Sequence, residues 1–306
     1  MGWFIIKRLG WMLLTLWVVY SVSFVLMRSV PGSPLSAERK VSPEIEQNLK
    51  RRYRLDQPLG VQYWDDLRRI VLHGDLGASL KIQDFSVNEI IAQGFPVSAS
   101  LGILALAFAL TLGLSAGIIS AVRRGSLADF SMMTIATIGI ALPNFVIAGI
   151  VIILFVFLWP LFPPGGWGRI SNIILPAFCL GAPYAAYIAR LTRTGMLDVL
   201  SQDYIRTAFA KGLSERTVIL RHALRGALLP VVSFLGPAIA GVLTGSLVVE
   251  KIFGIPGLGV HFVNAALQLD YPLAMGLVLL YTTLLYVMNL LVDLSYAILD
   301  PRVKLH

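Results

Sequence analysis

The chain has 306 residues, of which 57% are apolar and 14% are charged, with a formal net charge of +8 and a mean hydropathy of +0.77. Soluble domains have roughly 45–50% apolar and about 25% charged residues, so this composition excludes an ordinary soluble protein and predicts an all-α, polytopic membrane protein. The single cysteine, Cys179, excludes a disulfide within the chain, and the four histidines have no ligand spacing, so no metal site is expected.

The first predicted element, in residues 1–30, is a membrane span over residues 9–27 that follows Lys7 and Arg8. A helix needs about 20 apolar residues to cross a bilayer, whereas a cleavable signal has an apolar core of roughly 7–15 residues and a small-residue cleavage site. This run is too long for a signal and ends at Arg28. We therefore expect it to remain as an uncleaved first span.

Residues 31–95 follow as a polar region that carries no net charge. Residues 42–44 predict a helix start with proline at its tolerated first position. A second amphipathic stripe begins at Tyr63 and Trp64 and continues to Val71. We expect a small helical domain whose apolar stripes pack on one another or on the membrane face. The alternative is that Tyr63 and Trp64 form a docking surface for a soluble partner.

The next helix start is marked by Ser86 and Glu89, which have the spacing of a capping box. Gly94 and Pro96 follow within a few residues. We expect these two residues to close this short helix before the second span begins.

Residues 96–306 are predicted to form a core of five further spans. Gly113 and Gly117 have the four-residue spacing that lets helix backbones approach closely, and Pro143 breaks the third span. The glycine-rich residues 254–259 lack the strand and helix of a nucleotide fold, so we expect a turn after the fifth span. The expected spans are residues 96–122, 130–158, 172–188, 228–249 and 272–298.

The longest polar interruption lies within residues 191–227 and predicts two short helices joined by a glycine elbow. The first helix is expected to be capped by Ser201 or Asp203 and to end at Gly212, which can adopt the left-handed conformation of helix ends. Ser214 can cap the second helix. Because the sequence on both sides is apolar, this segment is the expected meeting point with a soluble partner.

Basic residues predict that both termini and this segment are cytoplasmic. With the N-terminus inside, the inner segments carry thirteen Lys and Arg against five Asp and Glu, and the difference equals the whole formal net charge of +8. Cytoplasmic loops carry such an excess of Lys and Arg. The same bias explains the basic composition without nucleic acid, since the chain has no basic groove interleaved with aromatic residues.

The sequence does not predict an enzyme. It has no GxxxxGK[ST] phosphate loop, so no nucleotide or other cofactor site and no catalytic residue is expected in this chain. The notable ionisable residues of the spans are Arg28 and Asp293, whereas a proton-driven carrier needs a relay of them. A secondary transporter driven by an ion gradient remains the alternative function.

A resemblance supports a more specific function. Residues 206–230, RTAFAKGLSERTVILRHALRGALLP, resemble the cytoplasmic loop signature of the permease subunits of bacterial peptide importers of the ATP-binding cassette class. Arg206, Thr207 and Ala208 stand where the broader importer pattern has Glu-Ala-Ala. Further segments along the chain are similar to this family and occur in the family's order, among them YRLDQPLGVQYWDDLRRIVLHGDLG, EKIFGIPGLG and LLVDLSYAILDPR. The pattern looks closest to the first permease of the oligopeptide branch.

The resemblance implies a subunit of the bacterial inner membrane with a periplasmic helical domain at residues 31–95. It implies pairing with a second homologous permease around a peptide path within the lipid bilayer. It also implies two ATP-binding subunits, which bind ATP and Mg outside this chain, and a periplasmic peptide-binding protein. A permease of the same family for nickel, glutathione or other small peptides is the alternative.

The expected coupling residues lie in the glycine elbow and in the two helices that it joins. Small side chains there would allow close approach of an ATPase subunit, and charged side chains would fix its register. The residues expected to contact the ATPase are Asp203, Arg206, Ala208, Ala210, Lys211, Gly212 and Glu215.

Overall fold

The computed structural model describes residues 2–30, 56–82 and 84–299, and within them the chain is helical with one isolated antiparallel bridge, between Ala78 and Ser86. The expected helix start at residues 42–44 lies outside the described residues. The α-helices are α1 (Gly2–Ser29), α3 (Leu59–His73), α4 (Val87–Val122), α5 (Leu127–Ala141), α6 (Asn144–Ile152), α7 (Ile170–Leu200), α8 (Asp203–Ala210), α9 (Glu215–Thr217), α10 (Leu224–Ala227), α11 (Leu229–Leu243), α12 (Leu247–Phe253), α13 (Leu258–Leu267) and α14 (Tyr271–Leu299). The π-helical turns η1 (Ile153–Leu158) and η2 (Val218–Ala223) lie between them.

Four helices, α1, α4, α7 and α14, are long and apolar enough to cross a membrane. Three bent pairs pass the same test of length and composition, namely α5 with α6 and η1, α9 to α10 with α11, and α12 with α13, which raises the possible number of spans to 7. The predicted all-α, polytopic class is confirmed. The predicted number of spans stays a prediction, because it depends on whether α12 and α13 together cross the membrane or re-enter on one side.

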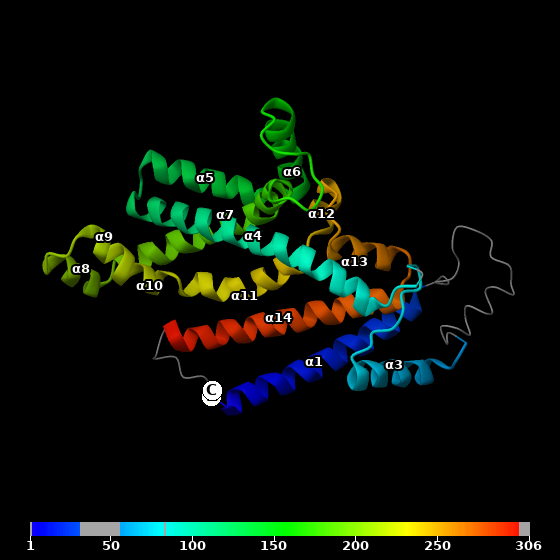
Figure 1. Ribbon diagram of the computed structural model, residues 1–306. Coiled ribbons are helices and arrows are strands. Elements are labelled where there is room, and N and C mark those ends of the chain that lie inside the picture. The colour runs from blue at the N-terminus through cyan, green and yellow to red at the C-terminus, as the bar shows by residue number, and fades with distance from the viewer. Residues whose placement is uncertain (1, 31–55, 83, 300–306) are drawn as a thin grey trace.

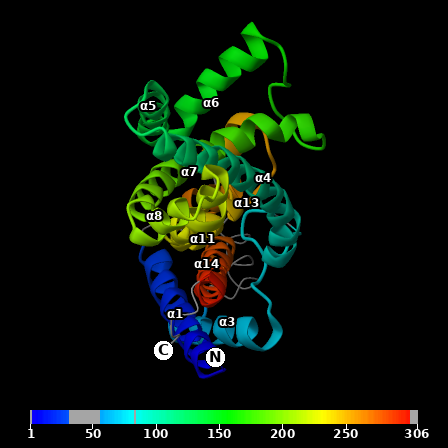
Figure 2. The same cartoon turned by 90° about the vertical axis from the view of Figure 1, so that its left-hand side faces the viewer.

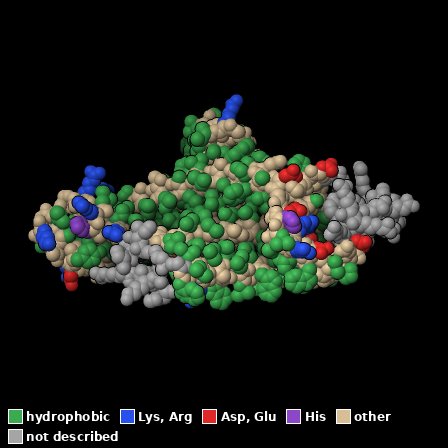
Figure 3. Space-filling view, turned by 60° about the horizontal axis from the view of Figure 1, so that its bottom comes forward, with side chains coloured by type: hydrophobic (Ala, Val, Ile, Leu, Met, Phe, Trp, Pro, Cys, Tyr) green, Lys and Arg blue, Asp and Glu red, His purple; other side chains and the backbone are tan. Residues whose placement is uncertain are grey.

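The long helices lie side by side with their axes aligned along the length of the molecule (Figures 1 and 2). α14 packs against α11 and α1, α4 packs along α7, and α5 covers α7. The beginning of α1, the end of α14 and the short helices α8 to α10 lie at one end of the molecule, which we call the α8 end. Helices α3 and α13 lie at the opposite end, the α3 end. Figure 3 shows an apolar belt between these ends and charged side chains gathered at both, as expected for a protein whose middle faces lipid.

Helices α4 and α7 approach closely through glycines. A Cβ atom on Gly117 would lie 2.6 Å from the carbonyl oxygen of Ala189, and one on Gly113 would lie 2.7 Å from that of Ala185. Only a residue without a side chain permits such backbone contact, so the predicted role of this glycine pair is confirmed. The main apolar core is built on these two helices, with Leu101, Ala105, Cys179 and Leu180 buried at their contact.

The expected end of the short helix at Gly94 and Pro96 is wrong. The capping box at Ser86 and Glu89 is present, but α4 continues through Pro96 to Val122. Proline removes one backbone hydrogen bond, and a membrane helix tolerates this loss when its neighbours pack against it. Gly94 has a packing role instead, since a Cβ atom there would lie 2.7 Å from the side chain of Leu258.

The fourth and fifth expected spans have different bounds in the structure. α7 extends to Leu200, twelve residues beyond the expected end at residue 188, because no helix breaker interrupts its polar last turns. α11 ends at Leu243 rather than at residue 249. Gly245 follows with a φ of +85°, a left-handed conformation that stops the helix. The expected glycine-rich turn is present at residues 254–257, but it joins two helices that were not expected, α12 and α13, which differ in direction by 109°.

The predicted break at Pro143 is confirmed. α5 ends before it and α6 begins after it, and the two segments differ in direction by 112°. Proline disfavours the helical conformation in the residue that precedes it, here Leu142, which is extended with a ψ of 129°. As a result α6 and η1 project away from the other helices (Figure 2).

Candidate functional site

The candidate site is the helical segment at the α8 end, residues 201–227. α8 begins after Gln202, so neither Ser201 nor Asp203 is its N-cap residue as expected. The hydroxyl of Ser201 donates instead to the carbonyl of Asp198 at 2.8 Å. Asp203 lies in the first turn of α8, where the helix dipole favours a negative charge.

The predicted glycine elbow is present. Gly212 has a φ of +79°, and its N–H donates to the carbonyl of Phe209 at 2.9 Å. A Cβ atom at Gly212 would meet no atom within 4 Å, so glycine is needed there for its backbone conformation and not for space. The predicted cap is also present, because the hydroxyl of Ser214 accepts from the N–H of Thr217 at 3.4 Å. The second helix then runs without a gap through α9, η2 and α10.

One side of this segment is buried within the chain. Ile205 of α8 packs with Val218, Ala223 and Met196 in one apolar cluster. Ala208 is 8% exposed and belongs to the same cluster. The structure therefore places this expected contact residue inside the protein, where its small side chain lets α8 lie close to η2.

The other expected contact residues share the opposite, exposed side. Asp203 and Arg206 form an ion pair on that side, with 3.3 Å between the guanidinium nitrogen and the carboxylate oxygen. Both side chains are largely exposed, and pairs of this kind contribute about 0–1 kcal/mol, so they remain available to a partner. The exposed residues of the expected set are Asp203, Arg206, Ala210, Lys211, Gly212 and Glu215.

Large apolar side chains that are exposed on this segment were missed by the sequence analysis. Tyr204, Phe209, Leu213 and Leu220 are exposed on the segment at the α8 end. The sequence held a signal for them, because α8 is only eight residues long and has more apolar side chains than its one buried face can cover. Large exposed apolar side chains that gather on one short segment are typical of interaction surfaces.

This surface is mounted rigidly on the long helices. A Cβ atom on Gly195 of α7 would lie 2.5 Å from the carbonyl oxygen of Ala227, so α10 touches the backbone of α7 directly. Nearby, Arg193 of α7 binds Asp129 of α5 through two hydrogen bonds of 2.8 and 2.9 Å. Asp129 is 5% exposed and also accepts from the hydroxyl of Ser120 on α4. These contacts tie three helices together beside the segment.

The two expected docking residues at the α3 end are in different environments. The carbonyl of Tyr63 accepts from the hydroxyl of Tyr20 at 2.9 Å, and the ring of Tyr63 packs edge-on against Phe24. Tyr63 therefore fixes α3 to α1. Trp64 is 64% exposed and is free to contact a partner.

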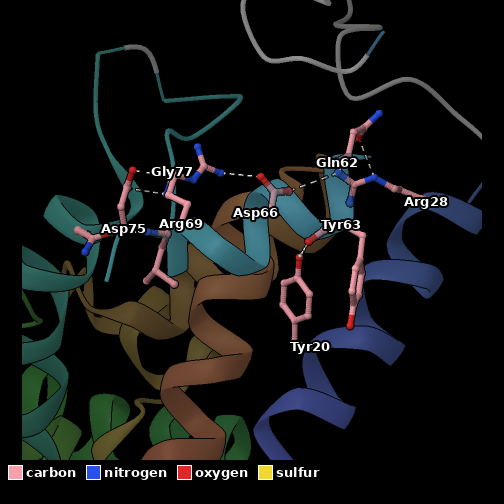
Figure 4. Close-up of polar contacts among 10 residues, drawn as sticks. Tyr20, Arg28, Gln62, Tyr63, Asp66, Arg69, Asp75 and Gly77 are labelled. Atoms are coloured by element: carbon pink, nitrogen blue, oxygen red, sulfur yellow. Dashed lines mark hydrogen bonds and ion pairs between the residues drawn. The ribbon is translucent and has the colours of Figure 1, made fainter. Parts of the chain in front are cut away.

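A polar cluster holds the remaining part of α3 against the end of α1 (Figure 4). The guanidinium of Arg28 donates to the side-chain oxygen of Gln62 at 2.9 and 3.2 Å and lies 3.8 Å from the ring centre of Phe24. Asp66 lies 3.8 Å from the same guanidinium and accepts from Arg69 at 2.7 Å. α3 is thus a fixed part of the fold rather than a loose appendage. Within the described residues no group of three or more His, Cys, Asp or Glu could hold a metal ion.

Long apolar helices that pack through glycines, with an exposed helical elbow at one end, are the features of an integral membrane permease subunit. The sequence matches the family of binding-protein-dependent transport system inner membrane components over residues 113–305, and the N-terminal part of such membrane components over residues 1–102. The chain belongs to this family.

Known relatives match over the full length. The chain is 45% identical to the dipeptide transport system permease protein DppB of Bacillus subtilis over 306 residues, which is 100% of this chain and 99% of the relative. It is 44% identical to the oligopeptide transport system permease protein OppB of Escherichia coli K12 over 303 residues, which is 98% of this chain and 99% of the relative. A solved structure of the MetNI methionine ABC transporter in an inward-facing conformation matches with a TM-score of 0.54 and 16% identity, over 69% of this chain and 96% of that one. This last likeness concerns the fold alone.

Proposed function

We propose that the chain is a permease subunit of an ATP-driven, binding-protein-dependent peptide importer of the bacterial inner membrane. The full-length similarity to one dipeptide and one oligopeptide permease carries this proposal. The two identities are nearly equal, so the proposed substrate class is short peptides without a choice between the two branches. An ion-gradient carrier is not favoured, because the relatives and the family are components of binding-protein-dependent systems.

We propose that a second homologous permease encloses the peptide path together with this chain. Two ATP-binding subunits bind the α8 end from the cytoplasm, and a periplasmic peptide-binding protein binds the α3 end. Both chain termini are cytoplasmic in this arrangement. It agrees with the basic residues of the inner segments, and with the start of α1 and the end of α14 lying at the α8 end.

The exposed elbow surface is the proposed contact with the ATPase, through Asp203, Arg206, Ala210, Lys211, Gly212 and Glu215. Moving a two-state equilibrium from 1:99 to 99:1 requires a differential binding energy of about 5.5 kcal/mol. Fully burying one large apolar side chain contributes about 1.5–3 kcal/mol, and Tyr204, Phe209, Leu213 and Leu220 are each about half exposed. Burying their exposed parts in only one of the two states would therefore supply roughly 3–5 kcal/mol, which is most of this requirement. The charged residues then fix the register of the contact.

Site-specific crosslinking tests this contact. Cys179 is buried and is first replaced by alanine, so that one new cysteine at Ala210 is the reactive thiol. We expect the tagged Ala210→Cys chain to copurify with an ATP-hydrolysing subunit and to crosslink to it. A matched control is Ala266→Cys, an exposed alanine on α13 at the opposite end. Equal crosslinking from both positions, or transport of a labelled tripeptide by the isolated chain in vesicles, would contradict the proposal.

A further inference from the structure

Glu250 of α12 is a carboxyl group that is 0% exposed in the interior of a membrane protein. Burying an ionisable group in a membrane protein costs free energy, so such groups are found mainly where they have a function and where hydrogen bonds satisfy them. Neither the elbow surface nor the docking surface at the α3 end uses this residue. Its surroundings therefore call for a separate explanation.

Both carboxyl oxygens of Glu250 accept hydrogen bonds. The hydroxyl of Ser98 on α4 donates to one oxygen at 2.8 Å, and the N–H of Val260 on α13 donates to the other at 3.3 Å. Ser98 in turn accepts from the N–H of Leu258 at 2.8 Å, so its own proton is directed to Glu250. Glu250 thus joins three helices, α4, α12 and α13, and together with Ser98 it accepts from two of the free N–H groups at the start of α13.

The backbone is shaped around this carboxyl group by three glycines. A Cβ atom on Gly257 would lie 2.6 Å from the carboxyl carbon of Glu250, and one on Gly259 would lie 2.9 Å from a carboxyl oxygen. A Cβ atom on Gly245 would collide with the other oxygen. A larger residue at any of these positions would expel the carboxyl group. The glycine-rich turn therefore encloses Glu250 closely.

The far end of α13 is held in a similar way. Asp270 is buried at the start of α14 and accepts from the hydroxyl of Ser79 and from the N–H of Leu80, the latter at 3.1 Å. The pair α12 and α13 is therefore fastened to α4 near the junction of the two helices, and to the segment before α4 at the end of α13. Between these points Leu258 and Ala265 pack into the apolar cluster that joins α4 and α14.

Helix α4 connects this region to the α8 end. Its second half packs along α7 through Gly113 and Gly117, and α7 carries the elbow segment through the contact between Gly195 and Ala227. A displacement of the elbow is thus passed to α7 and α4, whose backbones are too close to slide independently. The hydrogen bonds of Ser98 and Glu250 then attach α12 and α13 to α4, beside the apolar contact of Leu258 with Gly94.

We propose that Glu250 is a positioning residue that fastens the pair α12 and α13 to α4, so that the α3 end moves as one body with α4 and α7 during transport. The inference rests on the proposed function. It assigns to a buried residue far from the ATPase contact the task of linking movement at one end of the bundle to the other.

Glu250→Gln removes one acceptor and places an NH₂ donor opposite a hydrogen-bond donor. Ser98→Ala removes one hydroxyl group and is the milder second variant. Lys251→Gln, at the exposed neighbour on the same helix, is the matched control. The three variants are assembled with the partner permease and ATPase subunits in vesicles, and a radiolabelled tripeptide is supplied with its binding protein.

We expect Glu250→Gln to lower the number of tripeptides moved per ATP hydrolysed about tenfold, which corresponds to about 1.4 kcal/mol, while the rate of hydrolysis is unchanged. Ser98→Ala is expected to shift this ratio in the same direction and Lys251→Gln to leave it unchanged. A purely structural role would lower transport and hydrolysis together and leave their ratio intact. That result, or an unchanged ratio in both Glu250→Gln and Ser98→Ala, overturns the inference.

A distance measurement separates this inference from the proposed function. Spin labels are placed at exposed Ala266 on α13 and exposed Leu112 on α4, in the chain lacking Cys179. We expect one narrow distance distribution in the wild type and a broad one in Glu250→Gln. If the wild-type assembly moved no peptide but showed this contrast, the proposed function would fail and the attachment would stand. Identical distributions in both chains would overturn the attachment.

Discussion

The ion pair between Asp129 and Arg193 should be one of the strongest single contributions to stability at the α8 end. Asp129 accepts two hydrogen bonds from the guanidinium of Arg193, at 2.8 and 2.9 Å. It also accepts one hydrogen bond from the N–H of Gly125, at 2.9 Å, and one from the hydroxyl of Ser120. Asp129→Ala would leave all of these donors without their acceptor. The side chain of Arg193 is buried only in part, with 27% of it exposed, so water can replace some of what it loses.

Removing one partner of a fully buried pair costs about 3–5 kcal/mol, and the partial exposure of Arg193 reduces our expectation to about 2–3 kcal/mol. With an unfolding entropy of about 2.1 cal/mol/K per residue, a loss of about 1 kcal/mol lowers the unfolding midpoint of a 306-residue chain by about 1.6 °C, so Asp129→Ala should lower it by about 3–5 °C. The assay is thermal unfolding of the purified chain in detergent. Asp198→Ala, at an exposed position on α7, is the control.

A double-mutant cycle decides whether the effect belongs to the pair. Arg193→Met removes the charge but keeps an apolar stem, and we expect the double variant to be less destabilised than the sum of the two single variants, by about 1–3 kcal/mol. Breaking a buried pair leaves an uncompensated group, whereas removing both members does not. Simple additivity, or an unfolding midpoint for Asp129→Ala equal to that of the Asp198→Ala control, would refute the reasoning.

Three further predictions concern single positions. Gly212→Val should abolish peptide transport and leave membrane insertion intact, because a β-branched residue is strained at a φ of +79°; transport at the wild-type rate would remove the elbow from the mechanism. Trp64→Ala should raise the concentration of binding protein needed for half-maximal transport in vesicles, and an unchanged value would count against docking at the α3 end. Gly117→Leu should prevent α4 and α7 from packing and give no monodisperse protein, whereas Gly149→Leu, where a Cβ atom meets nothing within 4 Å, should purify normally.

Features of the site that follow from local rules could be predicted from the sequence. A glycine that follows a short helix and precedes a serine cap predicts an elbow whatever surrounds it, and Gly212 and Ser214 behave as expected. The break at Pro143 and the capping box at Ser86 also depend only on their neighbours in the chain. In each case the backbone chemistry of one or two residues decides the local structure.

Features that depend on distant contacts could not be predicted in this way. In the sequence Pro96 predicts the end of a helix. In the structure α4 continues through it, because distant segments pack against this part of the helix, as Leu258 does against Gly94. Ala208 reads as a small surface residue, but it is buried because η2 folds back over α8. Glu250 reads as a charged residue near a turn, and its burial depends on Ser98, which lies 152 positions earlier in the chain.

The positions of the rigid contacts and of the breaks restrict where the protein can change shape. α4 and α7 cannot slide past each other, because Gly113 and Gly117 place backbone against backbone, so these helices should move as one body. Movement must then be absorbed where a helix is interrupted by an extended residue, as before Pro143. The elbow segment is held on α7 through the contact between Gly195 and Ala227, so it should move with these helices. A rigid pair of helices between the elbow and the fastened α12–α13 pair should therefore transmit a displacement over the length of the bundle.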